Sequence, residues 1–169
     1  MHQPDNVCEE SVYNKMYNEH ASAIWRFIYF KCGNSAQADD LVQDAFIKLF
    51  QNCAKVSPEK AKSYLYTVAN NAFLNEIAHS KVVLKHQNQT TSNTNKETPQ
   101  FLLEEKEFSE KLQRAIADLT ESQRTAFLMN RIDGKKYKEI AVILNISVKA
   151  VEKRIGKALA SLRKNIENI

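Results

Sequence analysis

Turn-forming residues are scarce in this sequence. Only three glycines and three prolines are spread over its 169 residues. A β-rich chain of that length needs many more of them to form its hairpins and turns. Apolar residues also recur at helical spacing over most of the chain. We therefore predict an all-α fold.

A polar tract divides the chain. The segment "HQNQTTSNTNKETPQ", residues 86–100, contains no apolar residue. Because such a segment cannot bury enough surface to fold, we predict a flexible linker over residues 85–104. Helical patterns lie on both sides of this linker. The chain is thus expected to form two small helical domains, residues 10–84 and 105–169.

Charge is distributed unevenly between these domains. The formal net charge is +4 overall, but it is −1 over residues 1–84 and +5 over residues 105–169. The basic excess is concentrated near the C-terminus, at Lys149, Lys153, Arg154, Lys157, Arg163 and Lys164. A polyanion is one partner that suits such a segment. A solvated basic helix would account for the charge alone equally well.

The sequence lacks the patterns typical of disulfide-rich, zinc-binding, membrane-spanning and catalytic proteins. Cys8, Cys32 and Cys53 are odd in number and far apart, without a Cys-x-x-Cys pair, so neither a disulfide nor a zinc site is expected and a reducing compartment is the default. The most apolar run, "AIWRFIYF", is too short for a membrane span, and no signal peptide is apparent. No nucleophile–base pair, metal-ligand spacing or phosphate-binding loop appears. We therefore expect a cytoplasmic protein that is not an enzyme and needs no cofactor or metal.

The stretch "AVILNISVKAVEKR", residues 141–154, interrupts a helical pattern for only three residues. Asn145 is expected to adopt a left-handed conformation, because asparagine is the commonest substitute for glycine there. Ile146 should point into the angle between two helices. Ser147 should cap a new helix that begins at Val148. These features predict a helix-turn-helix.

Other local signals complete this second domain. Thr120 followed by Gln123 fits a capping box. Gly134 is expected to end the next helix in a left-handed conformation, and a further helix is expected over residues 137–144. Gly156 lies inside the last helix, where glycine costs about 1 kcal/mol relative to alanine. It either permits close backbone approach or has no role.

The last helix is predicted to have two faces. An apolar stripe is expected to face inward and consists of Val148, Val151, Ile155, Leu159 and Leu162. Lys149, Lys153 and Lys157 recur on the other side, with Arg154 beside them. Such a face suits the major groove of DNA, where lysine and arginine reach phosphates and base edges. The alternative is an unrelated bundle whose last helix is merely basic.

The segment "AIADLTESQRTAFLMNRIDGKKYKEIAVILNISVKAVEKRIGKALASLRK" resembles region 4 of the extracytoplasmic-function (ECF) class of bacterial sigma factors. The shared positions are Leu119, Arg124, Phe127, Gly134, Tyr137, Glu139, Ile140, Ala141, Leu144, Ile146, Ser147, Val151, Arg154, Ala158 and Leu162. Residues 38–50, "ADDLVQDAFIKLF", are similar to region 2.2 of that class, and residues 63–81, "SYLYTVANNAFLNEIAHSK", to regions 2.3 and 2.4. The resemblance implies a region 2 helical bundle and a region 4 helix-turn-helix, joined by the linker.

The resemblance also implies which residues bind partners. Region 4 would read the −35 element with Ser147, Lys149, Ala150, Lys153, Arg154 and Lys157. Region 2 would help to open the −10 element with Lys55, Lys60, Lys62, Tyr64, Asn70, Asn71 and Asn75, whose side chains can hold phosphates or catch unstacked bases. On general aromatic burial alone, Tyr64 is more simply a core residue.

The resemblance further implies that the helix of residues 38–50 binds polymerase. Leu41, Ala45 and Leu49 are expected to face inward. The remaining polar residues, Asp39, Asp40, Gln43 and Asp44, would meet the β′ clamp coiled coil of RNA polymerase. A solvated acidic face explains these charges about as well.

The sequence departs from the family pattern mainly in region 2. Asn70 stands where the family usually has arginine, Asn75 where it often has aspartate, and Ala78 and His79 where basic residues are common. Thr120 replaces a frequent proline. Region 2.4 is therefore expected to make fewer contacts with duplex phosphates than is usual in the family. Either the −10 sequence preference is unusual, or core polymerase and the basic second domain hold the DNA.

The implied function is promoter recognition for bacterial RNA polymerase. The implied partners are the core polymerase, through its β′ clamp and β flap, promoter DNA and an anti-sigma factor, without direct membrane insertion. A competing hypothesis is a stand-alone helix-turn-helix repressor or activator that never binds polymerase. Such regulators usually dimerise, and the sequence offers neither a dimer helix nor a purpose for the first domain.

Overall fold

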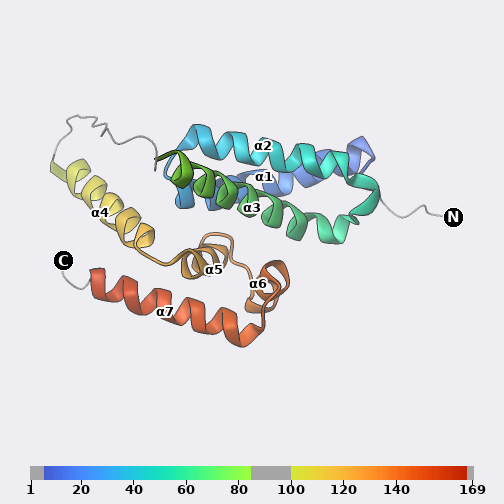
Figure 1. The fold of residues 1–169 in the computed structure, drawn as a ribbon. Helices are drawn as coiled ribbons and strands as arrows, with labels where there is room; N and C mark the ends of the chain where they lie inside the picture. The colour runs from blue at the N-terminus through green and yellow to red at the C-terminus, as the bar shows by residue number, and fades with distance from the viewer. Residues whose placement is uncertain (1–5, 85–99, 167–169) are drawn as a thin grey trace.

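The computed structural model describes residues 6–84 and 100–166, and within them the regular elements are all helical (Figure 1). The first domain contains α1 (Glu10–Cys32), α2 (Ser35–Gln51), the short 3₁₀ helix η1 (Cys53–Lys55) and α3 (Pro58–Leu84). The second contains α4 (Gln100–Ala117), α5 (Glu121–Arg131), α6 (Tyr137–Leu144) and α7 (Val148–Ile166). The predicted all-α class is confirmed. Residues 85–99 of the predicted linker lie outside the described residues, and its last five residues belong to α4.

Local signals set the corners of the first bundle. Gly33 ends α1 with φ 69°, and its N–H donates to the carbonyl of Tyr29 at 2.7 Å. The side chain of Asn34 then caps α2 by accepting from the backbone N–H of Gln37 at 3.0 Å. Pro58 begins α3, at a helical position where a missing N–H costs nothing. The chain therefore reverses twice, and α1, α2 and α3 pack against one another (Figure 1).

The core of the first bundle is built from one stripe of each helix. Its fully buried members include Ile24, Phe27, Ile28, Leu41, Ala45, Leu49, Ala61, Leu65, Tyr66 and Ala69. The predicted inward row of α2 is thus confirmed. At the end where α1 begins and α2 ends, Tyr13 packs edge-on against Phe46 and Phe50, and its hydroxyl donates to the carbonyl of Phe46 at 3.0 Å.

The second domain packs α4, α5 and α6 against α7. Its buried side chains include Ala115, Ile116, Leu119, Ala126, Leu128, Met129, Ile140, Ala141, Val151, Ile155, Ala158 and Leu162. Arg124 holds the corner between α4 and α5, because its guanidinium donates to the carbonyls of Ile116, Ala117 and Leu119. Backbone carbonyls left free at the end of α4 are satisfied in this way.

Two predictions about caps in this domain need correction. The capping box at Thr120 is wrong: its side chain makes no cap hydrogen bond and lies 3.5 Å from the Ser122 hydroxyl instead. Helix α5 ends at Arg131 rather than at Gly134. Gly134 does adopt the predicted left-handed conformation, with φ 61°, but within the turn that leads to α6.

The expectation that no disulfide forms is also wrong. Cys8, just before α1, is bonded to Cys53 in η1, with the two Cα atoms 5.0 Å apart. Cys32 is the free cysteine of the described residues. Spacing along the chain gave no signal for the bond, because packing of α1 against α2 brings together residues that are 45 positions apart.

Gly156 offers a test of helix propensity in α7. It is exposed, and a Cβ placed on it meets no atom within 4 Å. Gly156→Ala is therefore expected to raise the free energy of unfolding by up to about 1 kcal/mol in urea titrations followed by circular dichroism. Gly33→Ala is the matched control, and it should lower stability because its φ is positive. An unchanged or lower stability for Gly156→Ala would contradict the prediction.

Candidate nucleic-acid interface

The turn between α6 and α7 has the predicted geometry. Asn145 adopts φ 51° and ψ 50°, and it is the one non-glycine residue with positive φ in the described chain. The N–H of Ile146 donates to the carbonyl of Ala141 at 3.0 Å, and Ile146 packs against the core. The Ser147 hydroxyl accepts from the N–H of Ala150 at 3.1 Å and so caps α7. A helix-turn-helix is thereby confirmed.

Helix α7 carries the predicted basic face. Lys149, Lys153 and Lys157 are exposed, and α7 forms the outer layer of the second domain, away from the first bundle (Figure 1). Ser147 is exposed as well, whereas Ala150 and Arg154 are half-buried. The inward stripe is confirmed at Val151, Ile155 and Leu162 but is wrong at Val148, which is 41% exposed.

Of the residues predicted to meet the −10 element, Lys55 lies on η1 and the others lie on α3. Lys55, Lys60, Asn71 and Asn75 are exposed. Lys62 and Tyr64 are half-buried, and the Tyr64 hydroxyl donates to the carbonyl of Lys48 at 3.4 Å. Asn70 is also half-buried, and its side chain is engaged at the contact between the domains. The structure therefore leaves only part of this set open to a ligand.

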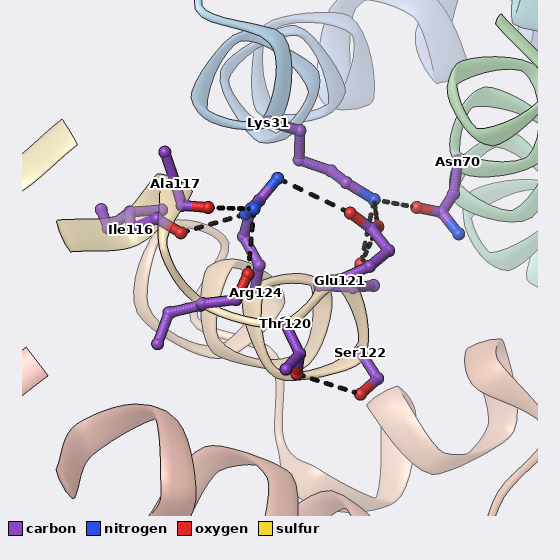
Figure 2. Close-up of polar contacts among 10 residues, drawn as sticks. Lys31, Asn70, Ile116, Ala117, Thr120, Glu121, Ser122 and Arg124 are labelled. Carbon is purple, nitrogen blue, oxygen red and sulfur yellow. Dashed lines mark hydrogen bonds and ion pairs between the residues drawn. The ribbon is translucent and has the colours of Figure 1, made fainter. Parts of the chain in front are cut away.

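Lys31 of α1 forms the centre of that contact (Figure 2). Its side chain has no exposed surface, and its ammonium group pairs with Glu121 of α5, donates to Asn70 of α3 and donates to the Thr125 hydroxyl of α5 at 2.9 Å. The rings of Phe27 and Phe73 lie 5.1 Å and 4.9 Å from the same nitrogen. Burial lowers the pKa of Lys31, and the carboxylate of Glu121 opposes that change. Sequence reasoning missed this residue, because a lysine in an amphipathic helix normally marks the solvent side.

A second contact joins α3 to the turn before α6. The ammonium of Lys135 lies 3.4 Å from the centre of the Tyr66 ring and 3.4 Å from a carboxylate oxygen of Asp133. Burial lowers the pKa of Lys135 to about 8 despite the opposing effect of Asp133. The Thr67 hydroxyl approaches the carbonyl of Ile143 at 3.5 Å. The second domain therefore covers one face of α3.

One residue from each of the two predicted DNA-binding sets lines the same cavity. A cavity of about 440 Å³ is lined by Asn70 and Leu74 of α3, by Thr120, Glu121, Ser122 and Thr125, and by Leu144 and Arg154. Arg154 is therefore less exposed than Lys149, Lys153 and Lys157. It lies instead where the second domain faces α3.

The predicted polymerase-binding residues form an exposed acidic face on α2. Asp39, Asp40, Gln43 and Asp44 are all exposed. Asp39 accepts from the indole N–H of Trp25 at 2.7 Å, so α1 contributes to this surface. A groove of about 300 Å³ beside it is lined by Tyr17, Ala21, Ser22, Trp25, Asp39, Val42 and Gln43.

Residues 6–84 and 100–166 contain neither a metal-binding cluster nor a membrane-spanning helix. No group of three or more histidine, cysteine or acidic side chains there could hold a metal ion. None of the helices in these segments is long and apolar enough to cross a membrane.

Family models match both domains. Residues 16–81 match sigma-70 region 2, and residues 109–162 match sigma-70 region 4. The chain belongs to the sigma-70 family. Sigma factors are transcription initiation factors of RNA polymerase rather than enzymes, so this chain acts with polymerase at promoters.

Individual relatives are ECF sigma factors. The chain is 26% identical to SigL of Mycobacterium tuberculosis over 170 residues, which cover 96% of this chain and 93% of SigL. It is 24% identical to SigE of Mycolicibacterium smegmatis over 89% of its own length, but it spans only 60% of that longer protein. The fold is similar to that of the sigma factor RpoE of Bartonella quintana, solved with the anti-sigma factor NepR, with a TM-score of 0.72, 16% identity and coverage of 92% and 96% of the two chains.

The ion pair between Lys31 and Glu121 is expected to hold the two regions of this sigma factor together. Glu121→Gln leaves the buried ammonium with neutral partners only, so the free energy of unfolding should fall by about 1–3 kcal/mol and the regions should separate more readily. Urea titration and small-angle scattering measure the two effects. Glu110→Gln, which removes an exposed pair with Arg114, is the control and should have little effect. Equal effects of both substitutions would contradict the prediction.

Proposed function

We propose that this sigma factor of the ECF class directs RNA polymerase to promoters by placing α7 in the −35 major groove and α3, with the loop before it, at the −10 element. The observation that carries the −35 assignment is the capped helix-turn-helix whose second helix presents a row of exposed lysines. Second helices of such motifs are the elements that enter the major groove.

The dimensions of α7 support the −35 assignment. At 1.5 Å per residue, Lys149 and Lys157 are separated by about 12 Å along the helix axis, close to the width of the major groove. Ser147 and Ala150 lie at the N-terminal end of α7, where base edges are met in helix-turn-helix proteins. Lys149, Lys153 and Lys157 would hold phosphates or reach guanine edges.

Only some of the residues that the family resemblance implies for the −10 element are exposed in the structure. Lys55, Lys60, Asn71 and Asn75 are exposed enough to meet DNA directly. Lys62, Tyr64 and Asn70 are half-buried, so their contribution requires local rearrangement. For Asn70 that rearrangement is loss of the hydrogen bond from Lys31.

Binding both elements at once requires the domains to separate. The −35 and −10 elements are about 25 base pairs apart, which is about 85 Å of DNA at 3.4 Å per base pair. In the structure, Asn70 and Arg154 line one cavity. We therefore propose that the arrangement seen here belongs to the free chain and that DNA and polymerase stabilise an extended one.

The remaining partners follow from the same assignment. The acidic face of α2 would dock on the β′ clamp coiled coil, and the second domain would meet the β flap. An anti-sigma factor is a further proposed partner, supported by the similarity to RpoE, which was solved with NepR. Because promoters and polymerase lie in the cytoplasm, we propose a cytoplasmic location.

Replacing single residues of α7 tests the −35 assignment. Lys153→Ala should weaken binding of the holoenzyme to a mapped promoter and lower the salt dependence of binding by about one ion, without changing affinity for core polymerase. Arg163→Ala, an equal loss of charge about 15 Å further along the same helix, should have the smaller effect. Equal losses in promoter and core binding would contradict the assignment.

Reversing charge on α2 tests the polymerase contact. Asp40→Lys with Asp44→Lys should reduce affinity for core polymerase and leave the circular dichroism spectrum unchanged, because both side chains are exposed. Glu10→Lys with Glu19→Lys makes the same change of charge on exposed positions of α1 and serves as the control. If core affinity is unchanged in the α2 variant, these residues do not belong to the interface.

A further inference from the structure

The Cys8–Cys53 bond lies directly before residues 54–60, which run from η1 into the first turn of α3, are proposed to meet the −10 element and are called the −10 loop here. Cys8 is two residues ahead of α1, and Cys53 is the first residue of η1. Lys55, the first basic residue assigned to the −10 element, follows Cys53 by two positions. The bond therefore joins the N-terminal segment to the base of a loop that is proposed to meet DNA.

Both ends of the bond are anchored by contacts that do not need it. Val7 is completely buried, and the N–H of Cys8 donates to the side chain of Asn6 at 3.1 Å. On the other side, the side chain of Asn52 donates to the carbonyl of Lys48 at 2.9 Å, and the carbonyl of Asn52 accepts from the N–H of Lys55 at 2.8 Å. Burial of Val7 and the hydrogen bonds of Asn52 hold the two segments without the bond, so opening or closing it does not require unfolding of the bundle.

The two cysteines are also accessible to small reagents. Cys8 is exposed and Cys53 is half-buried. Cys32 is half-buried like Cys53 but forms no disulfide; burial raises the pKa of its thiol, and its sulfur contacts the backbone of Asn34. Disulfides of cytosolic proteins are typically transient and redox-sensing. Cys8 and Cys53, which lie beside the −10 loop and are not fully buried, fit a redox-sensing disulfide of this kind.

We propose that Cys8 and Cys53 form a reversible redox pair that controls opening of the −10 element. The inference rests on the proposed role of this loop. In the reduced protein only non-covalent contacts, the burial of Val7 and the hydrogen bonds of Asn52, hold the base of the loop, and these can break transiently while the loop reshapes around an unstacked base, as base capture requires. In the oxidised protein the covalent link to the N-terminal segment fixes the base of the loop. Opening is therefore slower, while −35 binding by α7 is unaffected.

The chemistry is ordinary thiol–disulfide exchange. One cysteine thiolate attacks a low-molecular-weight disulfide, forms a mixed disulfide and releases one thiolate. The second cysteine thiolate then attacks the sulfur of the first cysteine, which forms the Cys8–Cys53 bond and releases the second small thiol. The small disulfide is reduced by two electrons to two thiols, and the protein dithiol is oxidised. An excess of a reducing dithiol reverses both steps.

The test compares oxidised and reduced full-length chain in the holoenzyme. The chain is equilibrated with glutathione disulfide or with dithiothreitol, freed of reagent, and added to core polymerase on a mapped promoter that carries a fluorescent base in the −10 element. Alkylation and mass spectrometry report the state of each cysteine. We expect a several-fold slower opening for the oxidised chain, with unchanged core affinity and −35 binding.

Single substitutions separate the possible outcomes. Cys8→Ser and Cys53→Ser should each open the promoter at the reduced rate under both conditions, whereas Cys32→Ser should keep the redox response. If reduced holoenzyme opens the promoter and oxidation changes nothing, or if opening is faster after oxidation, the redox inference is overturned. If reduced holoenzyme selects no promoter, the proposed function itself fails.

Discussion

The buried ammonium group of Lys31 is the interaction on which the arrangement of this protein depends. A charge without exposed surface is tolerated only where it is paired and hydrogen-bonded. Here the carboxylate comes from α5 and the amide from α3. Because neither domain alone supplies both groups, satisfying Lys31 requires the two domains to lie together. In the second contact the buried lysine, Lys135, belongs to the second domain, and its ammonium lies over the Tyr66 ring of the first domain.

This arrangement also defines what must change for function. Lys149, Lys153 and Lys157, which are proposed to contact the −35 element, are exposed in the present arrangement. The surface proposed for the −10 element is partly occupied by the contact between domains, since the Asn70 side chain accepts a hydrogen bond from Lys31. A buried ion pair is weakly stabilising against full hydration of both groups, so such a contact can open when polymerase and DNA offer larger surfaces. The same polar residues can therefore hold the free chain together and be released for promoter binding.

Much of the second domain could be predicted from sequence because its signals are local. The left-handed turn at Asn145, the cap at Ser147 and the bounds of α6 depend on residues within one turn of each other, and the structure confirms all three. Local signals were wrong at two helix starts in this domain. Thr120 does not cap α5, and Val148, the first residue of α7, is exposed although its spacing matches the inward stripe.

The sequence by itself determined the all-α class, the family, the two-domain order and the basic face of α7. These properties follow from composition, from periodicity and from contacts between residues close in the chain. Only the tertiary structure decided that Lys31 is buried, that Asn70 is engaged, and that Cys8 meets Cys53. Each of these contacts joins residues about 40 or more positions apart, and the free energy of such a pairing depends on how whole helices pack rather than on any local pattern.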